Sequence, residues 1–138
     1  MIKAVKVLNA VSVFLFTVIL LVIYAYLPIM VDLSLEGVKG MHKQTFFYYA
    51  FGGFVTVNII LRIGINLGSR NLSTDLTAWI RTIIFIVNFY LTTLIGFLGV
   101  LNNASSIDPS NYAYLNYLGP IFLVFWIIGL FFFILQKK

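Results

Sequence analysis

Residues 8–31 have the sequence LNAVSVFLFTVILLVIYAYLPIMV, which contains no acidic or basic side chain. A helix rises ~1.5 Å per residue, so a stretch of this length covers the ~30 Å hydrocarbon core of a bilayer. Three further apolar stretches follow at residues 45–67, 78–101 and 112–135. Together they predict an all-α membrane protein with four transmembrane helices.

The composition supports the same class. The chain has 138 residues, of which 62% are hydrophobic and 9% are charged, whereas charged residues make up about a quarter of a typical soluble domain. The mean hydropathy is +1.05. We therefore expect residues 1–138 to form a single transmembrane domain.

Several kinds of chemistry are excluded by residue type. The chain has no cysteine, which removes disulfides, thiol redox chemistry and thiolate metal sites. Its one histidine, His42, lies between two apolar stretches, so two histidines of this chain cannot hold a haem within the membrane. Because no nucleophile–base pair, phosphate loop or metal-ligand spacing is visible either, we expect no catalytic residue, no metal and no cofactor.

The basic residues predict the orientation, because lysine and arginine near the ends of transmembrane helices resist translocation. Seven of them fall on one side of the expected bundle: Lys3, Lys6, Arg62, Arg70, Arg81, Lys137 and Lys138. The other side carries only Lys39 and Lys43, opposed by Asp32, Glu36 and Asp108. This bias predicts an inner (cytoplasmic) membrane protein with both termini in the cytoplasm. It also accounts for the net charge of +5 without a nucleic-acid partner.

Short polar connections separate the four stretches. Connections of this length make sequential helices antiparallel neighbours, so we expect an up-down-up-down helix bundle. Local signals agree with this. Gly68-Ser69 ends the second stretch, Ser73 or Thr74 can cap the third, and Asp108-Pro109-Ser110 is a turn before the fourth.

Polar side chains within the stretches are few, and none of the four acids is among them. This argues against a relay of buried carboxylates. Asn58, Arg62 and Asn66 follow one stripe of the second helix at spacing i, i+4 and i+8. Two interpretations remain open: Arg62 binds a lipid phosphate, an anion or a partner's carboxylate, or it extends to the headgroups for structural reasons alone. Asn88 in the third stretch is the expected hydrogen-bond partner of Asn58.

Small and aromatic residues indicate where helices meet other surfaces. Glycines at 52, 53, 64, 68, 96 and 99 predict close approach between helices. The fourth stretch is rich in phenylalanine and poor in polar groups, so it is expected to face lipid or an apolar partner helix.

A family resemblance covers about residues 1–65. Leu27-Pro28, Gly37, and Lys43 followed by Phe46-Phe47-Tyr48 resemble the helix–loop–helix pattern of the domain of unknown function found in bacterial Sdp-toxin immunity proteins, although the histidine comes later here, at His42. The resemblance implies a small bacterial inner-membrane protein and no specific chemistry.

The functional expectation follows from these features. We expect a non-enzymatic accessory or scaffolding subunit of a larger inner-membrane complex of the secretion, motility or energy-transducing motor type. Its partners would be other integral membrane subunits and phospholipid. The alternatives are a small oligomeric channel or carrier for an anion, lined by Asn58, Arg62, Asn66 and Asn88, and an immunity or lipid-binding membrane protein.

Overall fold

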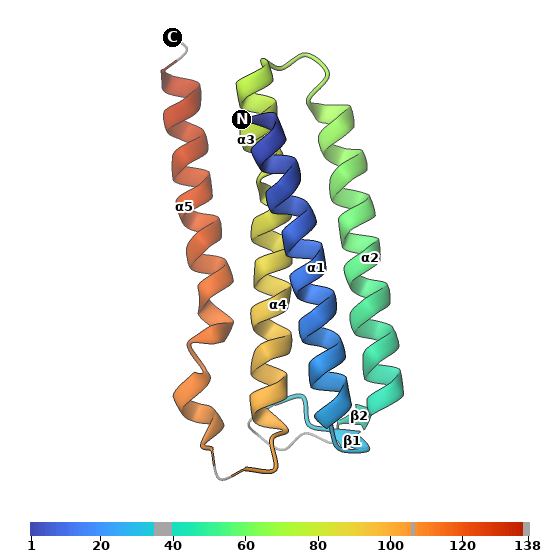
Figure 1. Cartoon of the computed structure of the whole chain (residues 1–138). Helices are drawn as coiled ribbons and strands as arrows, with labels where there is room; N and C mark the ends of the chain where they lie inside the picture. Colours follow the sequence, from blue (N-terminus) through green and yellow to red (C-terminus); the bar gives the residue numbers. More distant parts are fainter. Residues whose placement is uncertain (35–39, 106, 137–138) are drawn as a thin grey trace.

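The computed structural model describes residues 1–34, 40–105 and 107–136, and this part of the chain is dominated by helices (Figure 1). The α-helices are α1 (Ile2–Tyr26), α2 (Lys43–Gly68), α3 (Thr74–Arg81), α4 (Ile83–Leu101) and α5 (Leu115–Leu135). Since only Thr82 separates α3 from α4, the described residues provide four rods long and apolar enough to cross a membrane. Five residues named above lie outside the described part: Glu36, Gly37, Lys39, Lys137 and Lys138.

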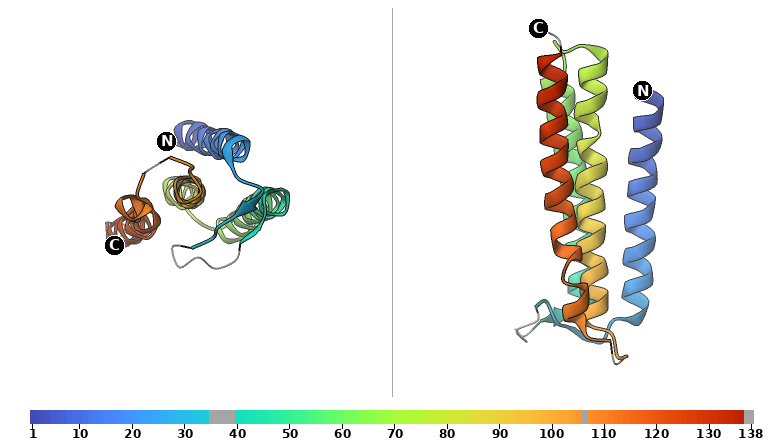
Figure 2. Two further views of the ribbon diagram at one scale, coloured as in Figure 1. Left: turned by 90° about the horizontal axis from the view of Figure 1, so that it is seen from below. Right: turned by 90° about the vertical axis from the view of Figure 1, so that its left-hand side faces the viewer.

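The rods alternate in direction, and the N-terminus lies at the same end of the molecule as the end of α5 (Figure 1). The arrangement is less symmetrical than a square bundle. α1, α2 and α4 contact one another, whereas α5 makes its main contacts with α4 and α3 (Figure 2). α4 is therefore the central helix, and α5 flanks it on one side.

The hydrophobic core reflects this arrangement. Its buried side chains come from α1, α2, α4 and the segment after α1: Phe16, Leu20, Leu27, Val31, Phe46, Phe54 and Ile95. No described residue of α5 belongs to this cluster. Only Gly119 of α5 is buried, so most of the α5 surface faces outward.

The first helix occupies different residues from the expected 8–31. It begins at Ile2, so Lys3 and Lys6 are helical, and it ends at Tyr26. Leu27 has extended backbone angles, φ −64° and ψ 139°, because a residue that precedes proline is disfavoured in the helical region. Pro28 thus ends the helix earlier than the apolar run alone predicts.

A short antiparallel pair of strands, absent from the all-α expectation, follows α1. β1 (Met30–Val31) pairs with β2 (Met41–His42). A side chain at Gly40 would overlap the Val31 carbonyl, so the close approach of the two segments requires glycine there. Asn102, at the end of α4, donates to the Asp32 carbonyl (2.9 Å) and accepts from the Asp32 amide (2.7 Å). This pair of bonds ties the connection to the bundle.

The third rod, expected over 78–101, begins earlier and is interrupted. Ser73 caps α3 by accepting a hydrogen bond from the Leu76 amide. At Thr82 the hydroxyl donates to the Trp79 carbonyl (2.6 Å), and Trp126 Nε1 of α5 donates to the Thr82 hydroxyl (2.9 Å). Threonine hydroxyls that bond to the preceding turn compete with the helix ladder. Thr82 therefore marks the break, and Trp126 attaches α5 to it.

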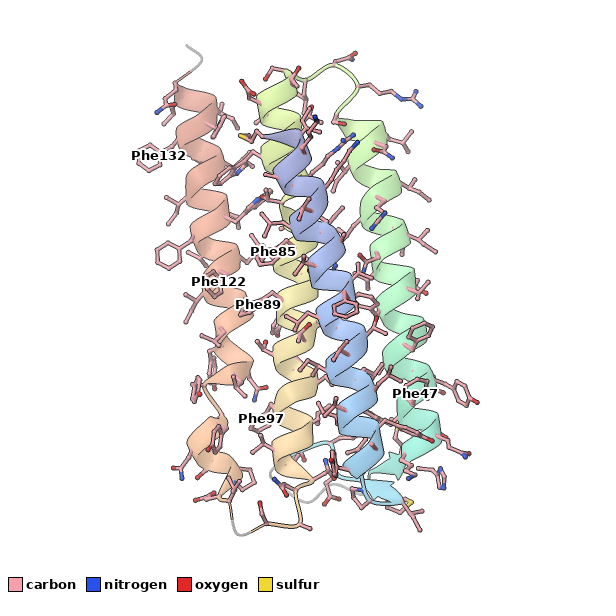
Figure 3. All side chains as sticks on the ribbon, in the orientation of Figure 1. Phe47, Phe85, Phe89, Phe97, Phe122 and Phe132 are labelled. Atoms are coloured by element: carbon pink, nitrogen blue, oxygen red, sulfur yellow. The ribbon has the colours of Figure 1, made fainter. Side chains whose placement is uncertain are left out.

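The fourth rod starts with a short 3-10 turn, η1 (Pro109–Tyr112), before α5 proper begins at Leu115. Asp108 caps the turn by accepting from the Ser110 amide (2.9 Å). Further along, Phe89 of α4 and Phe122 of α5 meet edge to face, with ring centroids 5.2 Å apart (Figure 3). Phe132 points away from the bundle in the same view.

Candidate functional site

Three helices meet at a buried network of polar side chains. Asn58 Nδ2 of α2 donates to Asn88 Oδ1 of α4 (2.8 Å), and Asn88 Nδ2 lies 3.2 Å from Asn58 Oδ1. Asn88 Nδ2 also donates to the Ser12 hydroxyl of α1 (2.9 Å). Asn88 is completely buried. The predicted bond between Asn58 and Asn88 is thus present, and Ser12 extends it to a third helix.

The network is closed to further ligands because its groups already have partners. Asn58 Nδ2 makes a second bond to the Phe54 carbonyl (3.0 Å), and the Ser12 hydroxyl donates to the Asn9 carbonyl (2.8 Å). Interhelical bonds of this kind contribute roughly 0.6–2 kcal/mol each within membranes. The role of the network is therefore structural: it fixes the positions of α1, α2 and α4 relative to one another.

An aromatic pair seals the bundle next to this network. The rings of Phe16 and Phe54 stack with centroids 3.8 Å apart and an interplanar angle of 4°. Phe16 follows Ser12 by one turn of α1, and Phe54 precedes Asn58 by one turn of α2, so in these antiparallel helices both rings lie on the β1–β2 side of the network. Both side chains are buried. From this pair toward the β1–β2 end, the buried side chains of the described residues are apolar apart from Thr93.

On the other side of the network lies a basic cavity of about 380 Å³. Its charged lining consists of Lys6 from α1, Arg62 from α2 and Arg81 from α3. Asn9 and Asn66 also line it, together with Ala10, Ile65 and Ile84. No carboxylate of the described residues is part of this lining. The cavity can therefore accommodate an anion.

The amides at this cavity hold its walls in place. Arg81 Nη2 donates to Asn66 Oδ1 (3.4 Å), and Asn9 Nδ2 donates to the Arg81 carbonyl (3.1 Å). Asn9 Oδ1 is buried and has no hydrogen-bond partner within the described chain. Arg62, in contrast, is exposed, and its guanidinium makes no hydrogen bond or ion pair with any described residue.

The structure thus divides the four predicted site residues into two pairs. Arg62 and Asn66 line the basic cavity, whereas Asn58 and Asn88 bond to each other in the interior and do not line it. The anion-channel alternative requires all four residues to line one path, and in the structure they do not. From the sequence, Lys6 and Arg81 were predicted only to orient the protein, and their place at the cavity was not predicted. One sequence feature could have indicated their place at the cavity: both were expected at the same membrane face as Arg62.

The glycines also separate into two groups. A side chain at Gly99 would meet Ile23, one at Gly119 would overlap the Tyr90 ring, and one at Gly129 would meet Trp79. At five other positions a Cβ would have nothing within 4 Å: Gly52, Gly53, Gly64, Gly68 and Gly96. The expected close approach is therefore found at Gly99 alone among the six predicted positions, and no other part of the described chain comes close to the α2 glycines.

Two residues of the segment that resembles the immunity-protein domain, His42 and Lys43, make contacts at the start of α2. His42 caps α2 by accepting from the Gln44 amide (3.3 Å), and Lys43 Nζ lies 5.2 Å from the centroid of the Tyr24 ring. In the described part of the chain, no three histidine, aspartate or glutamate side chains gather as a metal site would require.

A second cavity, about 490 Å³ in volume, lies at the opposite end between α1 and α4. Its described lining has no charged side chain and is mainly apolar, including Ile19, Val22, Gly96 and Gly99.

Comparison of the chain with protein-family models, with curated proteins and with solved structures finds no match.

Proposed function

We propose that this chain is a non-enzymatic integral membrane protein that binds and orients the transmembrane helices of a partner, as an accessory or scaffolding subunit of a larger inner-membrane complex. It crosses the membrane four times with both termini in the cytoplasm. The orientation is supported by the basic residues Lys3, Lys6, Arg62, Arg70 and Arg81, which occur near the ends of the helices where the N-terminus lies.

One observation carries the helix-binding role: the α2 glycines are open. A glycine within a helix costs roughly 0.5–1 kcal/mol relative to alanine, and nothing within the described chain uses the space at Gly53 or Gly64. These two are about three turns apart and lie on one stripe of the helix. In membranes, small residues on one stripe let a second helix approach closely.

The outer helix α5 gives additional support. Phe125, Phe131 and Phe132 are all exposed, and α5 contributes nothing to the central core. A partner helix can therefore dock on α2 or α5 without disturbing the packing of α1, α2 and α4. We assign the partner to α2, because α2 combines exposure with open glycines.

Native purification of the chain with its membrane partners tests this role. We expect a stoichiometric partner to copurify with the wild-type protein and to be lost from the Gly53→Leu/Gly64→Leu variant, because added bulk prevents close approach. Ile59→Phe is the matched control, since it adds bulk to an exposed position of the same helix away from that stripe. Recovery of the wild type as a lone monomer, or retention of the partner by the double variant, would contradict the proposal.

Anion transport is a second candidate, favoured by the basic cavity that ends about one turn from the Asn58–Asn88 network. Transport would require the Phe16–Phe54 stack to separate. Anion flux into liposomes containing the purified protein tests it: loss of flux in Arg62→Ala supports transport, and absence of flux under every anion gradient counts against it.

A further inference from the structure

We propose that the cavity between α1, α2 and α3 binds a phosphate group, either that of a phospholipid headgroup or that of a soluble phosphate compound. The inference goes beyond helix binding and does not depend on it. It rests on the charge, the unpartnered groups and the position of this cavity.

The charge of the cavity favours an anion, although Lys6 and Arg62 are exposed. Lys6, Arg62 and Arg81 come from three different helices and share one space of about 380 Å³. No described carboxylate lines that space or forms an ion pair with these side chains. Packing like charges together in a partly enclosed site is unfavourable unless a counter-charge is present. A bound anion supplies it.

The donor geometry favours phosphate among anions. Arginine presents a planar fork of N–H donors that matches the oxygens of phosphate, and such charge-assisted bonds are the strong ones. The fork of Arg62 has no partner in the described chain. Arg81 is held by Asn66 through only one of its nitrogens, which leaves its other donors available to the same ligand.

The position of the cavity corresponds to the phosphate layer of a membrane. Arg81 lies within ~11 Å of the start of the third rod at Thr74, Lys6 lies about one turn from the start of α1, and Arg62 lies within ~10 Å of the end of α2. Ala10 and Ile84 line the cavity about one turn further toward the middle of the bundle. Charged residues toward this end of the rods, with apolar residues further toward the middle of the bundle, match a headgroup followed by its acyl chains.

Asn9 indicates what stands beside the phosphate. Its Oδ1 is a buried acceptor without a partner in the described chain, and its Nδ2 is already bonded to the Arg81 carbonyl. A buried acceptor needs a donor. The hydroxyls of a glycerol headgroup or the ammonium of ethanolamine can provide one, whereas the methylated ammonium of choline cannot. We therefore expect phosphatidylglycerol or phosphatidylethanolamine to bind more tightly than phosphatidylcholine.

Native mass spectrometry of the purified, delipidated protein tests the proposal. The probes are added singly: phosphatidylglycerol, phosphatidylethanolamine, phosphatidylcholine, glycerol phosphate and inorganic phosphate. We expect one bound phospholipid in the wild type. In Arg62→Gln we expect the affinity for that phospholipid to be weaker by about tenfold or more, because the variant loses a charge-assisted donor pair. Arg70→Gln is the matched control: it removes the same charge from the turn just after α2, but Arg70 does not line the cavity.

The outcomes separate the possible sources of the phosphate. Phospholipid binding that depends on Arg62 but not on Arg70 assigns the site to a headgroup. Binding of glycerol phosphate or inorganic phosphate with the same dependence, and without lipid, assigns it to a soluble compound. Equal losses of binding in Arg62→Gln and Arg70→Gln would overturn the proposal. So would a wild-type protein that binds none of the probes and whose melting temperature none of them alters. Equal binding of phosphatidylcholine and phosphatidylglycerol would overturn the assignment of Asn9 Oδ1 as the acceptor for a donor of the headgroup.

Discussion

Asn58 and Asn88 face each other across the centre of the bundle and are linked amide to amide, at 2.8 and 3.2 Å. The two residues belong to α2 and α4, and Ser12 brings α1 into the same network. Away from this network α1, α2 and α4 meet largely through apolar side chains, which pack without strong directional preference. The asparagine pair therefore sets the register of the three helices.

Replacement of Asn88 by leucine is expected to destabilise the protein by about 1–3 kcal/mol. Asn88→Leu leaves Asn58 Oδ1 buried without its donor, and leaving such an acceptor unpaired costs this much. The loss can be measured as the change in the free energy of unfolding in detergent.

The double variant Asn58→Leu/Asn88→Leu is the informative control. Removing both amides leaves no orphaned acceptor between them, so the double variant should lose less stability than the sum of the two single variants. Strict additivity would show that the two side chains do not interact.

Gly119→Ala is expected to loosen the contact between α4 and α5. A methyl group there overlaps the Tyr90 side chain at the part of the ring nearest to the Tyr90 backbone. That part of the side chain cannot move away freely. The tryptophan fluorescence should report the change, because Trp126 of α5 donates to the Trp79 carbonyl of α3. Gly96→Ala adds the same methyl group where nothing lies within 4 Å and should leave the fluorescence and melting temperature nearly unaltered. Identical behaviour of the two variants would contradict the packing described for α5.

Asp108 should titrate below the ordinary range of an aspartate. Hydrogen bonds from the backbone and side chain of Ser110 lower the pKa of its carboxyl group. Because the folded pKa lies below the unfolded one, this cap stabilises the turn at pH values above the unfolded pKa, and the stabilisation is lost as the pH falls through the folded pKa.

A pH titration of the Asp108 carboxyl carbon by NMR checks this expectation. Ser110→Pro removes both donors and should return the pKa to the ordinary aspartate range, whereas Asn111→Ala leaves both donors in place and should not. A pKa in the wild type equal to that in Ser110→Pro would contradict the role of Asp108 as a cap.

The long helices could be predicted from sequence because four apolar runs of this length, if they cross a bilayer, restrict the possibilities. Four apolar runs of sufficient length leave few alternatives to helices, and short connections make those helices antiparallel. The Asn58–Asn88 bond could also be predicted, since a buried amide in an apolar surrounding needs a partner. The stop at Tyr26 was available from Pro28, but the apolar run continued past it and obscured the signal.

Other features depended on contacts that sequence periodicity does not contain. The β1–β2 pair joins two short segments through their backbones, and the break at Thr82 involves Trp126 from a distant part of the chain. The basic cavity was missed for a related reason: Lys6, Arg62 and Arg81 come together only when three helices are placed side by side. The open α2 glycines were expected to contact other helices of the same chain, which is wrong.

Labelling of single cysteines tests the central claim, a four-span bundle with both ends in the cytoplasm, most directly. The natural chain has no cysteine, so Ser69→Cys between α2 and α3 and Ser105→Cys between α4 and α5 each give one reporter. With a thiol reagent that does not cross membranes, we expect Ser105→Cys to react in intact cells and Ser69→Cys to react only after the cells are permeabilised. Reaction of Ser69→Cys in intact cells, or equal reaction of both positions, would contradict the account.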